Sequence, residues 1–334
     1  MTVKIAIIGL GQIGASIGLA LARHKDQVTT IGYDSVGEVN RKAIKMGAVE
    51  KIGHGLYASV EKADMVILAL PLDQVHETLQ AMAQDVREEA VVIDTAPVKL
   101  AVAAWAEEFL PPKRHYVGLT LAPNPLLLDE TGTGVYSARA DLFQNGLVAI
   151  TAPPGTVGEA IKLAASFVTL LGARAYFADL DEVDGIMATI HTLPALAAAA
   201  MAETVIGQPG WSDIRKFTGR PFVSAMRQLD GEEAPALAEA AQKNRVNTVR
   251  VLDEYIAALQ ALRVEIDKED KNSLQLRLKG VLNERTQWQR GRGEGSWQSS
   301  NSLKQEMPTF NDIWIGQLGL GKLLGKRKKK PEDD

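Results

Sequence analysis

The sequence contains no cysteine, and this absence excludes several kinds of chemistry at once. A chain without thiols has no disulfide framework, no thiolate nucleophile and no cysteine-ligated metal or cluster, and we expect no metal site. Nothing points to an oxidising compartment, so we expect a cytoplasmic protein. The 334 residues are 46% hydrophobic and 23% charged, a composition typical of a globular chain with room for two cores.

The chain also lacks a strong excess of charge of one sign. Its net charge is −4, so no overall basic field favours nucleic acid as a partner. No apolar run is expected to reach the length of a membrane span. Lys4 precedes an apolar run that could begin a secretory signal, but Gln12 and three glycines interrupt that run.

The most informative stretch lies near the start of the chain. The β-branched run 4–8 leads into Gly9, Gly11 and Gly14, after which residues 15–22 resume as an alanine and leucine pattern. A strand, a Gly-x-Gly-x-x-Gly turn and a helix form the first part of a dinucleotide-binding βαβ unit. In such a unit the first glycine makes a tight turn, the second admits a pyrophosphate and the third allows close helix packing.

The cofactor contacts expected around this turn follow from the same motif. Gln12 and Ile13 open the helix, where free backbone N–H groups and the helix dipole favour a phosphate. Asp34 ends the next strand, about twenty residues past Gly14, where a carboxylate binds the adenosine ribose hydroxyls. Residues 35–37 offer no neighbouring arginine for a 2′-phosphate, so the pattern favours NAD over NADP.

Strands and helices continue to alternate up to about residue 152. This pattern predicts a doubly wound α/β sheet of the Rossmann type over residues 1–152, with the ligand across the carboxyl ends of its strands. Leu70, Pro71 and Thr95 follow two such strands, and we expect them beside the nicotinamide half of the cofactor. The expected strands are 28–34, 65–71, 91–95, 116–121 and 147–151, and the expected helices are 36–47, 73–82 and 99–109.

The pattern changes after Pro153-Pro154-Gly155, and helices dominate residues 153–290. Dense alanine and a long periodic apolar face favour an all-helical domain whose helices need a partner face, so we expect a homodimer. Besides one short strand at 173–177, the expected helices cover 156–171, 182–205, 232–265 and 268–289.

The last segment, 291–334, is polar and ends in the basic run 326–330. Its composition predicts a flexible tail with a solvated charge cluster. The alternative is an apolar segment with a basic cluster that docks on an anionic membrane or on the neighbouring subunit.

Several stretches together resemble one family. Residues 3 to about 290 are similar to the prephenate and arogenate dehydrogenases of tyrosine biosynthesis, which join an NAD(P)-binding Rossmann domain to a helical dimerisation domain. The resemblance rests on residues 94–99 (DTAPVK), 116–122 (YVGLTLA), 134–143 (GVYSARADLF), 190–194 (IHTLP) and 213–220 (DIRKFTGR), and on Asn244-Arg245.

Three positions depart from the pattern of that family. Its catalytic histidine falls at Thr120, a neighbouring serine at Ala96, and the second histidine of a helix motif at Ala195. In the family, a ring hydroxyl is oxidised by hydride transfer, and the product loses carbon dioxide as the ring becomes aromatic. The histidine accepts the hydroxyl proton, which a threonine can only orient or relay.

The resemblance also implies which groups bind a small carboxylate substrate. His191 lies in an apolar helix at a substrate-binding position of the family, so it either binds substrate or replaces the missing base. Arg220, Arg215 and Lys99 match cationic positions of the family, although Lys99 could also be a solvated first-turn lysine. A guanidinium group suits bidentate capture of a carboxylate.

Two alternatives to a prephenate or arogenate dehydrogenase remain open at this stage. One is hydride transfer with another small substrate, such as a hydroxy acid or an imine. The other is a protein that senses NAD without turnover, which the loss of the usual base at Thr120 would allow.

Overall fold

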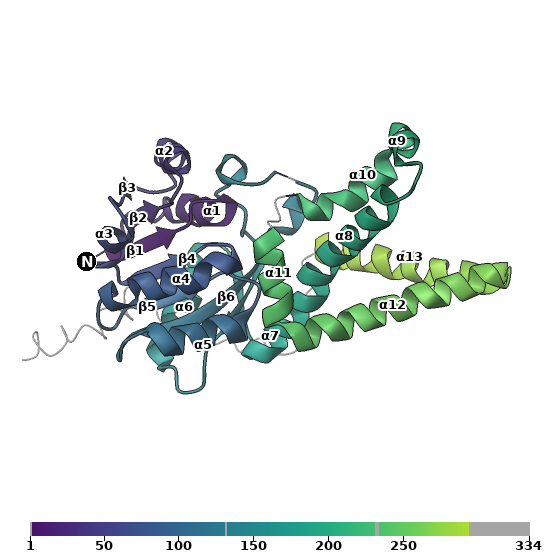
Figure 1. Ribbon diagram of the computed structural model, residues 1–334. Helices are drawn as coiled ribbons and strands as arrows, with labels where there is room; N and C mark the ends of the chain where they lie inside the picture. Colours follow the sequence, from purple (N-terminus) through teal and green to yellow (C-terminus); the bar gives the residue numbers. More distant parts are fainter. Residues whose placement is uncertain (1, 131, 231–233, 294–334) are drawn as a thin grey trace, which may run out of the picture.

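The computed structural model describes residues 2–130, 132–230 and 234–293. Figure 1 shows a sheet flanked by helices, followed by a separate group of helices that extends away from it. This arrangement confirms the predicted fold class, an α/β doubly wound domain followed by a helical one. The predictions for the tail concern mainly residues 294–334, which lie outside the described residues.

One sheet of eight strands forms the centre of the first domain, in the order β3-β2-β1-β4-β5-β6-β7-β8. All neighbours are parallel except β6 and β7, which are antiparallel. The strands are β1 (Val3–Ile8), β2 (Val28–Tyr33), β3 (Lys51–Ile52), β4 (Met65–Leu68), β5 (Val91–Asp94), β6 (His115–Ala122), β7 (Leu147–Thr151) and β8 (Arg174–Phe177).

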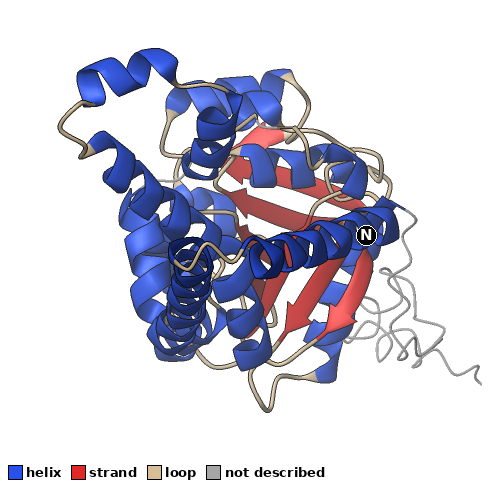
Figure 2. Cartoon of the chain, turned by 90° about the vertical axis from the view of Figure 1, so that its right-hand side faces the viewer, coloured by secondary structure: helices blue, strands red, loops and turns tan. Residues whose placement is uncertain are grey.

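Helices cover both faces of this sheet, as seen in Figure 2. One face packs against α1 (Gln12–Leu21), α2 (Gly37–Lys45) and α6 (Gly158–Leu170). The other packs against α3 (Leu56–Val60), α4 (Leu72–Met82) and α5 (Lys99–Phe109). Because both faces are covered, the central strands are continuous apolar runs, and β4 is buried at every position.

The sheet extends beyond residue 152, where we expected the first domain to end. Pro153-Pro154-Gly155 forms a turn within this domain, because α6 packs on the sheet and β8 pairs with β7. The strand expected at 173–177 is therefore present but belongs to the first domain. A proline-glycine turn looks the same in sequence whether it joins two elements or two domains.

The register of β6 determines how the strand ends meet. Gly118 on β6 pairs with Asp94, the last residue of β5, and β6 then extends four positions beyond it, to Ala122. On β6, β7 pairs with Gly118 and with this extension, in the opposite direction, and it ends at Thr151 opposite Gly118. The ends of β5 and β7 therefore lie at the same level, one on each side of Gly118.

The helical domain begins with a single long helical stretch, expected at 182–205 and observed from Leu180 to Ile206. It consists of α7 (Leu180–Met187), a π-helical turn η4 (Ala188–Thr192) and α8 (Leu193–Ile206). The π turn contains His191. Such turns are rare and widen the helix by one residue, which changes the direction of the side chains that follow.

The helix expected at 232–265 is divided in two. α11 (Ala234–Lys243) and α12 (Arg245–Asp267) meet at Asn244, whose φ of −107° and ψ of 38° are not helical. The Asn244 side chain donates a hydrogen bond to the backbone of another helix, which explains this conformation. α12 and α13 (Lys271–Gly293) then form the long hairpin seen in Figure 1.

Shorter elements complete the chain. They are α9 (Trp211–Ile214), α10 (Arg220–Met226) and the 3₁₀ turns η1 (Ala83–Asp85), η2 (Pro125–Leu127), η3 (Val135–Ser137), η5 (Arg215–Phe217) and η6 (Arg227–Leu229).

One helix differs from the expectation that no apolar run reaches the length of a membrane span. Leu180–Ile206 is long and apolar enough by length and composition, with a mean hydropathy of 1.5 over its best window. Residues 185–202 contain no Asp, Glu, Lys or Arg. Acidic residues flank this run on both sides, so the sequence reads as a shorter apolar segment. Only 22% of that window is buried within the chain, so the helix presents an apolar face outward.

Candidate active site at the strand ends

The three glycines of the turn after β1 occupy three different environments. Gly9 has a φ of +89°, and a Cβ there would lie 2.3 Å from the carbonyl oxygen of Ala69. A Cβ on Gly14 would lie 1.9 Å from the carbonyl oxygen of Gly9, so α1 can approach the turn only with glycine there. Gly11 has no neighbouring atom within 4 Å of its Cβ position, so its open side can admit a ligand.

The first turn of α1 fits an anion. Gly11 is the N-cap, no side chain caps the helix, and no acidic residue lies in its first turn. Gln12 and Ile13 are partly exposed at this end, and the Gln12 side-chain amide donates to the backbone oxygen of Ser137 at 3.5 Å. The helix therefore presents uncapped N–H donors and a positive dipole end beside the open side of Gly11.

Asp34 lies next to this turn, as the motif predicts. Its carboxylate accepts hydrogen bonds from the backbone N–H groups of Leu10 and Val36, both at 2.9 Å, and the Asn40 side chain brackets its backbone. These bonds fix the carboxylate at the end of β2 and leave each oxygen a further lone pair for a ribose hydroxyl.

The surroundings of Asp34 include an arginine that the sequence analysis missed. A guanidinium nitrogen of Arg41 lies 3.6 Å from the Cβ position of Gly37. Arg41 lies one turn of α2 after Gly37, and its side chain reaches back towards the start of that helix. A cation is therefore present near residues 35–37, which contain none themselves.

The residues expected beside the nicotinamide lie at the ends of β4 and β5. Leu70 is half-buried and Pro71 is exposed at the start of α4. Thr95 is half-buried, and its backbone N–H and hydroxyl both donate to the Leu68 carbonyl, at 3.1 and 3.3 Å. These bonds tie the ends of the two strands together.

Thr120 lies on the extension of β6, opposite Ala149. Thr120 as a whole is half-buried, but its hydroxyl oxygen is inaccessible and has no hydrogen-bond partner among the described residues. A buried hydroxyl without a partner is costly unless a ligand or water satisfies it. The Thr120 hydroxyl therefore retains the capacity to form a hydrogen bond, but it cannot act as a strong base.

Lys99 has an environment different from the expected substrate contact. Its side chain is 0% exposed, and its ammonium lies 2.7 Å from an oxygen of Asp94, which is also fully buried. The Tyr116 hydroxyl donates to the other Asp94 oxygen at 2.6 Å. Burial lowers the pKa of Lys99 and raises that of Tyr116, while the Asp94 charge favours protonation of both. In this structure Lys99 is thus an internal partner of Asp94.

Gly118 makes room for this buried cluster. A Cβ there would lie 2.6 Å from the Thr151 hydroxyl, 2.7 Å from the Lys99 side chain and 3.0 Å from the Tyr116 hydroxyl. Any other residue at this point of β6 would displace the ion pair.

Asp184 on α7 connects the second domain to this cluster. Its carboxylate accepts hydrogen bonds from the backbone N–H groups of Lys99 at 2.5 Å and Leu100 at 3.2 Å, which open α5. Its backbone carbonyl accepts from the Asn244 side chain at 2.6 Å. Burial raises the pKa of Asp184, and the two amide donors act in the opposite direction. The sequence signal is only an acidic residue in a helix, which is too common to identify this role.

The remaining predicted residues lie in the helical domain. His191 is half-buried within the π turn, which packs against α8, α11 and α12. Arg215 and Arg220 are exposed, in η5 and at the start of α10, and the Arg215 side chain donates to the Ser212 carbonyl at 3.4 Å. Figure 1 shows α10 beside α8 in the helical domain. Both arginines therefore belong to that domain.

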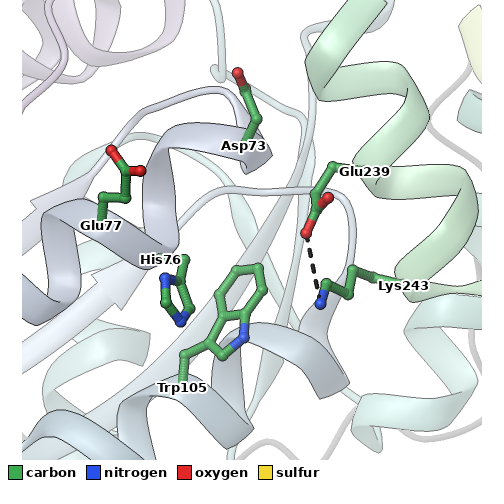
Figure 3. A pocket seen from close by; sticks show the side chains of 6 residues that line it. All are labelled: Asp73, His76, Glu77, Trp105, Glu239 and Lys243. Atoms are coloured by element: carbon green, nitrogen blue, oxygen red, sulfur yellow. Dashed lines mark ion pairs between the residues drawn. The ribbon is translucent and has the colours of Figure 1, made fainter.

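A small pocket of about 260 Å³ marks a second contact between the two domains, where α11 lies on α4. Figure 3 shows its six lining residues. His76 meets the Trp105 ring edge to face at 5.2 Å, and the Lys243 ammonium lies 5.5 Å from the same ring and 3.6 Å from Glu239. The cation over the Trp105 ring is therefore Lys243, a side chain of the pocket itself.

The fold and the glycine turn together define a dinucleotide-binding architecture. Two family models match the chain in succession: the nucleotide-binding domain of prephenate dehydrogenase over residues 17–177, and its dimerization domain over residues 180–280. The chain therefore belongs to the prephenate dehydrogenase family, which confirms the resemblance found in the sequence. The boundary between the two matches falls after β8, where the sheet ends.

Individual relatives agree with this assignment. The chain is 27% identical over 272 residues to a cyclohexadienyl dehydrogenase of Zymomonas mobilis, covering 81% of this chain and 90% of that protein. It is 26% identical over 275 residues to a prephenate dehydrogenase of Bacillus subtilis, covering 81% and 72%. The fold matches a prephenate dehydrogenase from A. aeolicus, in complex with hydroxyphenyl propionate and NAD⁺, with a TM-score of 0.75 at 23% identity, covering 86% and 98%.

The buried ion pair can be tested by stability. Replacing Lys99 by alanine leaves the Asp94 charge without its counter-ion in an interior site, which typically costs about 3–5 kcal/mol. We expect a loss of that size in the free energy of unfolding, measured by urea denaturation.

The matched control is Lys113→Ala, because Lys113 forms an exposed pair with Glu88 at 3.4 Å. Exposed pairs contribute about 0–1 kcal/mol. Equal losses in the two variants would contradict the assigned role of Lys99.

Proposed function

We propose that this chain catalyses the NAD-dependent oxidative decarboxylation of prephenate or arogenate. The observation that carries the proposal is a glycine turn open to an anion at the end of β1, in a chain that matches both domains of the prephenate dehydrogenase family. The names of the relatives, which include prephenate and cyclohexadienyl dehydrogenases, support the same substrate class.

The residues present fit a dinucleotide. Gly11 would admit its pyrophosphate at the turn that Gly9 and Gly14 make possible, the N–H groups of Gln12 and Ile13 would bind the phosphate oxygens, and Asp34 would hold the ribose. Leu70, Pro71 and Thr95 would line the nicotinamide half. When bound, NAD supplies the hydride acceptor that the side chains of this protein lack.

The proton of the substrate hydroxyl needs an acceptor within this chain. We assign that role to His191, because an imidazole can accept a proton near neutral pH and a threonine cannot. The hydroxyl of Thr120 would accept or donate one hydrogen bond and so orient the substrate. Two domains would then contribute to the reaction, with Thr120 on β6 and His191 on the π turn.

The carboxylate of the substrate needs a cation. Arg215 and Arg220 remain our proposed ligands, because both guanidinium groups are exposed and suit bidentate capture. Lys99 is no longer proposed, since its ammonium is buried against Asp94.

A second candidate function is NAD sensing without turnover. Thr120 and Ala96 replace the histidine and serine of the family pattern, so the strand ends keep the cofactor turn without the usual base. Turnover measurements separate this candidate from the enzyme.

We also propose that the chain acts as a homodimer. The helical domain matches a dimerization domain, and its helices expose many large apolar side chains. Those on the α12–α13 hairpin include Val246 at 76%, Ile266 at 63%, Leu276 at 72% and Val281 at 62% exposure. Such a face is stable in water only when a partner covers it.

The proposed reaction can be tested directly by enzymatic activity. We expect NADH to form, measured at 340 nm, when the protein is given NAD and either prephenate or arogenate. His191→Ala should lower kcat by roughly 10²–10⁴, the usual contribution of a positioned acid or base. His54→Ala, at an exposed histidine, should leave kcat unchanged. No turnover with either acid, while NAD still binds, would support the sensing candidate.

Cofactor choice is the second prediction. Asp34→Asn removes the charge that repels a 2′-phosphate and keeps one acceptor oxygen, which serves only one of the Leu10 and Val36 amides. Calorimetry with NAD and NADP should show the preference for NAD falling by roughly 10-fold to 100-fold, as expected when one or two charged hydrogen bonds are lost. Adding Arg41→Ala should weaken NADP binding again. An unchanged preference would contradict the role of Asp34.

Assembly is the third prediction. Sedimentation should give about twice the 36.1 kDa mass of one chain. Val281→Glu should shift the equilibrium towards monomers, because it places a charge on the apolar face of α13. Lys279→Glu changes an exposed residue of the same helix and should not. A wild-type monomer at micromolar concentration would contradict the proposal.

A further inference from the structure

Asp184 occupies the junction between the two domains. It lies on α7, in the helical domain, but its carboxylate accepts the backbone N–H groups of Lys99 and Leu100 in the sheet domain. The residue is 1% exposed. Helix α5 has no other side-chain cap, since its N-cap residue, Val98, cannot supply one. The helical domain therefore provides the cap and the negative charge that the start of α5 needs.

The segment before α5 is held between two buried carboxylates. At one end Asp94 accepts the Ala96 backbone N–H at 2.8 Å and the Lys99 ammonium at 2.7 Å. At the other end Asp184 holds the Lys99 backbone. Lys99 thus binds the sheet domain through its side chain and the helical domain through its main chain. Residues 95–98 connect β5 to α5 at the edge where the cofactor is expected.

The connection continues beyond Asp184 into the helical domain. The backbone oxygen of Asp184 accepts the Asn244 side chain at 2.6 Å, and Asn247 donates to Asn244 at 2.9 Å. Asp184 also lies about two helical turns before His191. The π turn that contains His191 begins at Ala188 and packs on α12, so this hydrogen-bonded chain fixes both helices that determine the position of His191.

We propose that Asp184 is a positioning residue that couples occupancy of the cofactor site to the placement of His191. A ligand that orders residues 95–98 also orders the start of α5, and through Asp184 it orders α7 and the π turn. The inference rests on the proposed function only for the role of His191 in turnover. The coupling between the domains can be tested without substrate.

The test compares amide hydrogen exchange of the full chain with and without NAD. In the wild type we expect NAD to slow exchange in the turn at 9–14 and also in residues 184–192. In Asp184→Ala and Asp184→Asn the slowing at 9–14 should persist and that at 184–192 should be lost. Asp181→Ala removes an exposed carboxylate from the same helix and should behave as the wild type.

Asp184→Asn provides the test if the alanine variant folds poorly, because asparagine caps helices about as well as aspartate. It still weakens the contact with α5, because it offers one acceptor oxygen for two amides instead of two. An identical NAD response at 184–192 in this variant, or no response there in the wild type, would overturn the proposal.

Kinetics provides a second readout if turnover is found. We expect kcat of Asp184→Asn to fall by roughly 10²-fold, the loss typical of a reacting group misplaced by about 1 Å, while the KM for NAD stays within about twofold. A parallel loss in kcat and NAD affinity would indicate a merely structural cap. Absence of turnover in the wild type would overturn the proposed function and would leave the exchange result to decide the coupling.

Discussion

The ion pair between Lys99 and Asp94 is the interaction on which the geometry of this protein depends. Two fully buried charges are tolerable only when each is well paired and further hydrogen-bonded, and here Tyr116 and the Ala96 amide complete the shell of Asp94. The pair fixes the end of β5, and the end of β5 fixes the start of α5. Because Asp184 binds that start, the pair supports one contact between the domains, while α11 and α4 form another.

The large features of the fold could be predicted from the sequence because they rest on repeated local patterns. Apolar β-branched runs alternate with amphipathic helices over the first domain, and Gly9, Gly11 and Gly14 mark a turn with few structural alternatives. For the same reason, the predicted bounds of helix 99–109 and strand 147–151 agree with those of α5 and β7. Family membership followed from several motifs together, and the two family models confirm it.

The features that the sequence did not predict depend on contacts between distant residues. A lysine in the first turn of a helix is normally solvated. Lys99 instead points inward, into space that exists because Gly118, on a different strand, has no side chain. Asn244 interrupts a helix because of a partner sixty positions away, and the Arg41 side chain reaches back to Gly37 at the start of α2. The roles of His191, Arg215 and Arg220 remain predictions, because their surroundings in the helical domain do not by themselves define a substrate.

Because β6 extends beyond β5, the face of the sheet on which Thr120 lies depends on the number of residues before Gly118. Side chains alternate between the two faces of a strand, so one inserted or deleted residue before Gly118 would turn Thr120 to the opposite face and place a side chain in the space beside Lys99. Substitutions along this strand change one group at a time, whereas a shift in length would change the Thr120 hydroxyl and the buried charges together. Relatives that diverge in their reacting groups can therefore be expected to vary the residues of this strand while keeping its length.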